Sequence, residues 1–143
     1  MQGITVSKPQ DSTRSTSDSG AETEHPRVVV AEDEALIRLD LVELLEEHGY
    51  EIVGQASDGE EAVRLANELG PDLIVMDVKM PKMDGIDVLR QLRASGIEVP
   101  VIFLTVLSDQ IYEEAALAGG AVDFVEKSRS LPILLKRMQL ILG

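Results

Sequence analysis

Acidic, hydroxyl and amine side chains follow four short apolar segments of the sequence, each directly after the last apolar residues. They are Glu32-Asp33, Asp77, Thr105 and Glu126-Lys127. If the apolar segments are parallel strands, these side chains meet at one edge, because the sites of open α/β sheets lie beyond the carboxyl ends of their strands. The pattern therefore predicts a polar site at that edge.

Three of these carboxylates, Glu32, Asp33 and Asp77, would repel one another by about 4 kcal/mol per close pair at an intermediate dielectric. Mg²⁺ would relieve this repulsion, since it binds a few carboxylates together with carbonyls and waters. Asp77 is the predicted phosphoryl acceptor, because carboxylates form aspartyl phosphates and it stands alone after the most apolar segment. Lys127 would bind the phosphoryl oxygens opposite the metal, and Thr105 would donate a hydrogen bond to one of them.

A plainer interpretation is that each acid caps the helix that follows it, which is a common role of acids after strands. For any single acid this alternative stays open. Capping does not explain why four strand ends supply an acid pair, an acid, a hydroxyl and an amine. The combination favours chemistry at this edge.

Five apolar segments alternate with amphipathic stretches from Arg27 onward, which is the pattern of a parallel sheet with helices on both faces. The segments are residues 27–31, 50–54, 72–76, 99–104 and 121–125. Three contain continuous apolar runs, as expected for strands covered on both faces. The predicted fold class is α/β, a doubly wound parallel five-stranded sheet of (βα)₅ type.

Apolar residues recur at helical spacing in five stretches between and after the segments. The stretches are Ile37, Leu41, Leu44 and Leu45; Ala62, Ala66 and Leu69; Ile86, Leu89 and Leu92; Ile111, Ala115 and Ala118; and Leu131, Leu134, Leu135 and Met138. Ser57 and Ser108 are expected to cap helix starts, and the glycines at 49, 70 and 119–120 to follow helix ends. Ile133 and Leu140 lie off the last stripe, which leaves either a partner face or tighter burial open.

The composition of the 143-residue chain excludes several functions. A formal net charge of −13 and only four aromatic residues (Phe 2, Tyr 2, Trp 0) argue against direct nucleic-acid binding. The absence of cysteine excludes disulfides and thiolate metal sites. No apolar run approaches the roughly 20 residues that span a bilayer. We expect a cytoplasmic protein without membrane contact.

The first 25 residues differ in composition from the rest. They are rich in Ser, Thr, Asp, Glu and Gln and have almost no large apolar side chain. Such a segment buries too little surface to offset its ordering entropy. We predict a disordered leader over residues 1–25 and one folded domain over residues 26–143.

Four segments of the sequence resemble the receiver domains of two-component response regulators, which are CheY-like proteins. The segments read VVVAEDE at residues 28–34, IVMDVKMPKMDG at 74–85, FLT at 103–105 and DFVEK at 123–127. The match runs in order over residues 26–143. The resemblance implies a flavodoxin-like fold with strand order 2-1-3-4-5, an order that periodicity alone does not give.

The resemblance also implies how the site works. Asp77 would accept a phosphoryl group from a sensor histidine kinase or a phosphotransferase, and Glu32, Asp33, Asp77 and the backbone carbonyl of Lys79 would hold Mg²⁺. The protein would not be an enzyme in the usual sense, since it would catalyse only its own phosphorylation and dephosphorylation.

A switch is the second implication of the resemblance. Thr105 would move toward the phosphoryl group and Phe124 would turn inward, which would remodel the face formed by the fourth helix, fifth strand and fifth helix. That face would signal to a downstream protein, to an output domain missing after Gly143, or to a second copy in a homodimer.

Three positions depart from the family pattern. Ser128 follows Lys127 where the family usually has proline with a cis bond, and a cis bond before another residue costs roughly 2.5 to 4 kcal/mol. Val106 stands where a small residue is common, and Glu32 replaces the commoner Asp. A degenerate receiver that takes no phosphate is therefore kept as an alternative.

Two further alternatives come from other classes of protein. A Mg²⁺-dependent phosphatase with an aspartyl nucleophile would need a second acid two residues later, but Val78 and Lys79 follow Asp77. The other is a nucleotide-binding or scaffolding module. Nucleotide binding has no support, because the sequence lacks both glycine-rich phosphate-binding motifs. Lys79 and Lys82 could steer an anionic donor toward the site, although solvated loop lysines are common.

Overall fold

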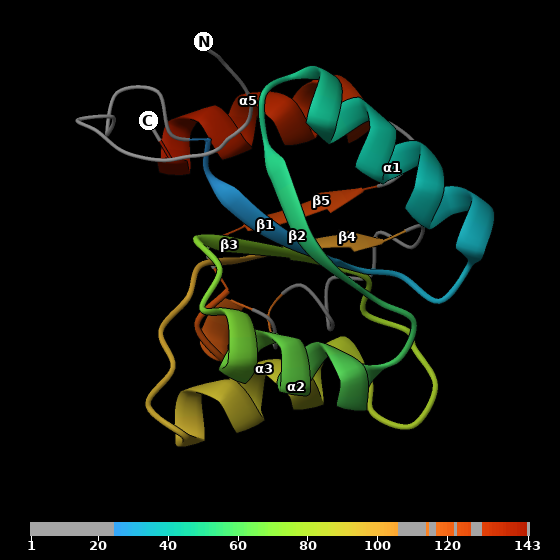
Figure 1. Ribbon diagram of the computed structural model, residues 1–143. Coiled ribbons are helices and arrows are strands. Elements are labelled where there is room, and N and C mark those ends of the chain that lie inside the picture. Colours follow the sequence, from blue (N-terminus) through green and yellow to red (C-terminus); the bar gives the residue numbers. More distant parts are fainter. Residues whose placement is uncertain (1–24, 106–113, 115–116, 122, 127–129, 143) are drawn as a thin grey trace, which may run out of the picture.

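The computed structural model describes residues 25–105, 114, 117–121, 123–126 and 130–142 (Figure 1). Nearly all of the predicted leader, residues 1–25, lies outside this part. Lys127 also lies outside it, as do three residues of the fourth predicted helix: Ser108, Ile111 and Ala115. The predictions on those residues remain predictions.

Five parallel strands form one sheet in the order β2-β1-β3-β4-β5. The strands are β1 (Arg27–Ala31), β2 (Glu51–Ala56), β3 (Leu73–Met76), β4 (Val101–Thr105) and β5 (Asp123–Glu126). The predicted fold class and the strand order implied by the resemblance are both confirmed. The order places β1 and β3 side by side at the centre, so the residues that follow them become neighbours.

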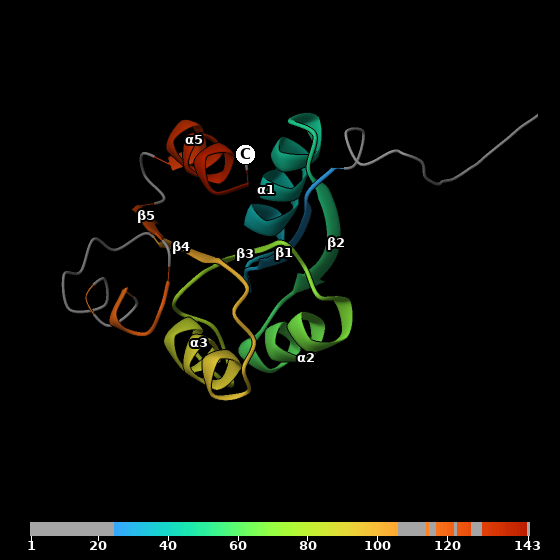
Figure 2. The same ribbon diagram turned by 90° about the vertical axis from the view of Figure 1, so that its left-hand side faces the viewer.

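Helices cover both faces of the sheet. They are α1 (Ala35–Glu47), α2 (Gly59–Leu69), α3 (Gly85–Ala94) and α5 (Ser130–Leu142). Figure 2 shows α1 and α5 on one face and α2 and α3 on the other. Ala118, from the fourth predicted stretch, is helical. None of the helices in the described part has the length and apolarity needed to span a bilayer.

Alternate residues of the central strands enter two separate cores, because successive side chains of a strand point to opposite faces. Val29 and Ile74 pack with the α2 and α3 layer, whereas Val28 and Val75 pack with the α1 and α5 layer. All four are essentially inaccessible to solvent. The continuous apolar runs are therefore explained by burial on both sides.

Where their side chains are described, the predicted stripes of α1, α2, α3 and α5 hold with two refinements, whereas Ala118 of the fourth stretch is exposed. In α1 the buried residues are Leu41, Val42 and Leu45, so the stripe includes Val42, which the periodicity left out. In α5, Ile133 is half-buried and packs against the core, whereas Leu140 stays 75% exposed. Of the two residues off the stripe, only Leu140 leaves apolar surface.

The start of α2 corrects a predicted cap. Asp58, and not Ser57, is the N-cap, and its carboxylate accepts the N–H of Glu61 at 2.8 Å. Ser57 instead donates its N–H and its hydroxyl to the Glu61 carboxylate at 2.9 and 3.3 Å. The helix begins one residue later because Asp58 is the residue whose side chain reaches the third N–H of the helix. At the other end, Gly70 is the left-handed C-cap, as predicted.

Strand β2 is longer than its apolar segment. It was expected over residues 50–54 but extends to Ala56, which pairs with Ala31 at the end of β1. The register shifts between Val28 and Val29, which pair with Ile52 and Gly54. Pairing with β1 thus extends the strand beyond its apolar residues to include the polar residue Gln55.

Candidate functional site

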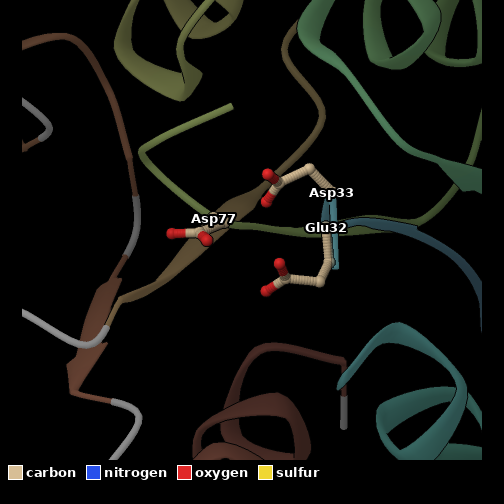
Figure 3. Close-up of side chains that lie close together, drawn as sticks. All are labelled: Glu32, Asp33 and Asp77. Carbon is tan, nitrogen blue, oxygen red and sulfur yellow. The ribbon is translucent and has the colours of Figure 1, made fainter. Parts of the chain in front are cut away.

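Glu32, Asp33 and Asp77 meet at the carboxyl ends of β1 and β3. The N–H of Asp77 donates to the carbonyl of Ala31 at 3.0 Å, which fixes the residue after β3 beside the last residue of β1. One carboxylate oxygen from each of the three acids lies within 4.8 Å of the others (Figure 3). The structure therefore brings together the three acids that the sequence singled out.

The three acids differ in exposure. Glu32 is 2% exposed, Asp77 is half-buried and Asp33 is exposed. Glu32 is also held in place by its neighbours, because its N–H donates to Ala56 at 2.9 Å and its Oε2 accepts the N–H of Glu34 at 3.0 Å. The longer arm of Glu32 is thus fixed at the base of the cluster.

Arg38 of α1 holds the backbone of Glu32 in place. Its Nη1 donates to the backbone carbonyl of Glu32 at 2.6 Å, and its Nε donates to the side chain of Gln55 at 3.3 Å. One guanidinium therefore links α1, the end of β1 and β2. No local pattern predicts this role, because the partners lie six and 17 residues away.

The capping alternative does not explain these acids. Helix α1 begins after Glu34 without a side-chain cap, and helix α3 is capped by Asp84, which accepts the N–H of Asp87 at 2.9 Å. Neither Asp33 nor Asp77 caps the helix that follows it. Their carboxylates face the cluster instead.

A loop over residues 77–85 connects Asp77 to α3 and returns close to it. The N–H of Gly85 donates to the carbonyl of Val78 at 2.6 Å. A Cβ at Gly85 would lie 2.5 Å from the carbonyl oxygen of Asp77 and 2.6 Å from the ring of Phe103. Only glycine allows the start of α3 to approach Asp77 so closely.

The start of α2 packs against the same loop. The N–H of Gly59 donates to Pro81 at 3.3 Å, and the Nζ of Lys82 lies 3.5 Å from the Asp58 carboxylate. The pKa of Asp58 is lowered, first by the hydrogen bond from the backbone of Glu61 and also by the charge of Lys82. The capping-box spacing does not identify this cap from the sequence, because Ser57 and Glu60 have the same spacing as Asp58 and Glu61.

The remaining predicted site residues are placed only by their backbone or not at all. Thr105 ends β4, which adjoins β3, and Phe124 lies in β5 opposite Phe103. The side chains of Thr105 and Phe124, and the whole of Lys127, lie outside the described part. Lys79 is exposed in the loop after Asp77.

The donor set of the cluster suits a hard divalent cation. Three carboxylates offer oxygen atoms only, which is the preference of Mg²⁺ and Ca²⁺ rather than of thiolate- or imidazole-seeking metals. In the residues with described positions, no other group of three or more His, Asp or Glu residues gathers this closely. The arrangement fits the predicted Mg²⁺ site.

Comparisons with known proteins agree with this geometry. The family model of the response regulator receiver domain matches residues 28–139. The transcriptional regulatory protein PdtaR of Mycobacterium tuberculosis is 48% identical over 114 residues, which are 80% of this chain and 55% of that protein. The chemotaxis protein CheY of Thermotoga maritima is 35% identical over 101 residues, 71% of this chain and 84% of that protein.

Solved structures show the same architecture. The receiver domain of a Francisella response regulator superposes with a TM-score of 0.76 at 35% identity, covering 82% of this chain and 96% of that chain. The chain belongs to the response regulator receiver domains. Such domains are generally Mg²⁺-dependent and are not classical enzymes. The chain spans only about half the length (55%) of PdtaR.

Proposed function

We propose that this receiver domain accepts a phosphoryl group on Asp77 from a sensor histidine kinase or a phosphotransferase, with Mg²⁺ bound. The observation that carries the proposal is the cluster of Glu32, Asp33 and Asp77, whose oxygens lie within 4.8 Å of one another at the end of the central strands. Membership in the receiver family supports the same chemistry.

Glu32, Asp33, Asp77 and the backbone carbonyl of Lys79 would hold the metal. Bound there, Mg²⁺ would offset the repulsion among the carboxylates and screen the charge of the phosphoryl group. Glu32 is suited to holding rather than reacting, because it is buried and already accepts the N–H of Glu34.

Asp77 is the acid proposed to react, because it is less buried than Glu32 and stands where the receiver resemblance implies the acceptor. One of its carboxylate oxygens would attack the phosphorus, and the bond from phosphorus to the donor's leaving nitrogen would break. Lys127 and Thr105 would bind the transferred oxygens. No carboxylate follows two residues after Asp77, where exposed Lys79 stands, so the phosphatase alternative lacks its acid.

The output of the domain is also part of the proposal. Thr105 and Phe124 would act as the switch, and the face formed by the fourth helix, β5 and α5 would bind a downstream protein, an output domain or a second copy in a homodimer. PdtaR is named as a transcriptional regulatory protein and extends beyond the region matched here. We assign residues 26–143 to the receiver and residues 1–25 to a leader, in a cytoplasmic protein that does not itself bind nucleic acid.

The decisive experiment is phosphorylation with acetyl phosphate, followed by intact-mass measurement and release with hydroxylamine. The parent is expected to gain one phosphoryl group with Mg²⁺ and none after chelation. Asp77→Asn should gain none, whereas Asp87→Asn, an exposed acid that pairs with Arg90 in α3, should behave as the parent. A parent that stays unmodified with Mg²⁺ would show that the domain is a degenerate receiver.

A further inference from the structure

Lys82 adopts an unusual backbone conformation within the loop over residues 77–85. Of the non-glycine residues that the structure describes, it is the one with a positive φ, 70°. A positive φ is unfavourable for a residue with a Cβ, and here it belongs to a three-residue γ-turn in which the N–H of Met83 donates to the carbonyl of Pro81 at 2.7 Å. The residues of this turn also contact α2.

Three consecutive residues of this loop contact the start of α2. The carbonyl of Pro81 accepts the N–H of Gly59 at 3.3 Å, and the Nζ of Lys82 pairs with the Oδ2 of Asp58 at 3.5 Å. The carbonyl oxygen of Met83 packs so close to Gly59 that a Cβ there would lie 1.9 Å from it. The middle of the loop is thus held by α2.

Asp58 is a fixed anchor for the flexible lysine side chain. Its Oδ1 accepts the N–H of Glu61 at 2.8 Å as the cap of α2, while its Oδ2 faces Lys82. Its side chain is only 18% exposed, compared with 58% for Lys82. Because the cap hydrogen bond from Glu61 orients the carboxylate, the pair links Lys82 to the start of α2.

The same loop contains Asp77 and Lys79. Its two ends are fixed by the bonds from Asp77 to Ala31 and from Gly85 to Val78. The segment between these ends is shaped by the turn hydrogen bond from Met83 to Pro81 and by the contacts with α2. Any change in this segment would shift Lys79, whose carbonyl is a proposed ligand.

We propose that the Asp58–Lys82 ion pair positions the loop for metal binding, an inference that rests on the proposed Mg²⁺ site. Together with the turn hydrogen bond, the pair holds Lys82 at its positive φ and thereby positions the Lys79 carbonyl for the metal. Lys82 is a positioning residue in this scheme and does not contact the reacting atoms. The sequence had suggested only that Lys82 steers anions.

The test is a Mg²⁺ titration of the full chain without a phosphoryl donor, followed by amide NMR shifts. Asp58→Asn keeps the cap, since Asn caps helices as well as Asp, and Lys82→Asn tolerates a positive φ. Both variants lose the pair. If the pair positions the loop, each should weaken Mg²⁺ binding by about two- to five-fold, the range that an exposed ion pair supports.

The direction of the Lys82→Asn effect separates positioning from simple charge. Charge alone predicts opposite effects, because Asp58→Asn removes a negative charge and weakens binding of a cation, whereas Lys82→Asn removes a positive charge and strengthens it. Positioning predicts that both weaken it and that the double variant is no weaker than either single one. Tighter or unchanged binding by Lys82→Asn would overturn the proposal.

Two matched variants complete the design. Glu60→Gln removes an acid that lies 4.0 Å from Lys82 and is 65% exposed, so it reports the charge effect and should leave binding near that of the parent. Lys82→Arg keeps the pair and should bind as the parent does. Variants that lower the unfolding temperature without metal but keep parental Mg²⁺ affinity would show a merely structural pair. A parent that binds no Mg²⁺ would instead refute the proposed function, and the inference with it.

Discussion

The two helical layers differ in the side chains that they pack against the sheet. In the layer of α2 and α3, α2 packs through the small residues Ala62 and Ala66, whereas α3 packs through larger side chains such as Leu89; glycines at 59 and 85 begin the two helices. The layer of α1 and α5 packs through large aliphatic side chains such as Leu45 and Met138. Small residues allow close backbone approach, so the first layer is fitted tightly to the loop over residues 77–85.

The second layer carries three of the four exposed large hydrophobic side chains in the described part, the fourth being Leu117. Leu36 and Leu39 of α1 are 78% and 49% exposed, and Leu140 of α5 is 75% exposed. Within the described part, neither α2 nor α3 has an exposed large hydrophobic residue. The layer of α2 and α3 therefore contacts the loop after Asp77, whereas the layer of α1 and α5 supports Glu32 through Arg38 and leaves more apolar surface exposed.

The largest expected loss of stability comes from a substitution in the core of α1. Leu45→Ala removes a fully buried side chain and should lower the free energy of unfolding by about 2 to 5 kcal/mol. Leu36→Ala, on the same helix but exposed, should change it by less than about 0.5 kcal/mol. Urea unfolding of both variants measures this, and similar losses would mean that Leu36 is covered in solution.

Gly59→Ala tests the close fit of the α2 layer. The new Cβ would meet a backbone oxygen that has no freedom to rotate away, so we expect a loss of about 3 kcal/mol, at the upper end for overpacking. Gly96→Ala is the control, because it has φ of 80° but nothing within 4 Å, and should cost about 1 kcal/mol.

Mg²⁺ affinity should distinguish the same two glycine variants. Gly59→Ala should also weaken Mg²⁺ binding, since it displaces the loop after Asp77, whereas Gly96→Ala should not. Parental affinity in Gly59→Ala would contradict the view that this layer shapes the site.

Mg²⁺ bound at the carboxyl ends of β1 and β3 should stabilise the fold. At ten times its dissociation constant, it should raise the free energy of unfolding by about 1.4 kcal/mol. Asp33→Asn should lose this gain and, without metal, be at least as stable as the parent because one repulsive charge is gone. Asp40→Asn, an exposed acid of α1, should keep the gain. Thermal unfolding with and without Mg²⁺ measures both effects.

The smallest effect concerns the pH dependence of the α2 cap. Because the pKa of Asp58 is lowered from its ordinary value of 3.8, its charge stabilises the fold fully above that value. The contribution is lost as pH falls from 3.8 through the lower folded pKa. Asp58→Asn should therefore unfold at a lower temperature than the parent at pH 7, and the difference should vanish in stronger acid. A difference that persists there would arise from something other than this charge.

Several features of the fold and site could be predicted because they depend on local pattern. The alternation of apolar runs with helical stripes predicted five strands, and four of the five strand ends marked candidate site residues. The strand order required the family resemblance, because periodicity does not say which strands pair. The Ser57 prediction was wrong because two adjacent residues both suit an N-cap, and side-chain reach decides between them.

The sequence by itself determined the alternation of elements, the apolar faces and the acids at the ends of β1 and β3, because burial period and residue chemistry are properties of short segments. Only the tertiary structure decided that Arg38 holds Glu32, that Asp58 meets Lys82 and that the glycines at 59 and 85 admit the loop. Those contacts join residues distant along the chain, and their formation depends on how the layers pack. No local pattern contains that information.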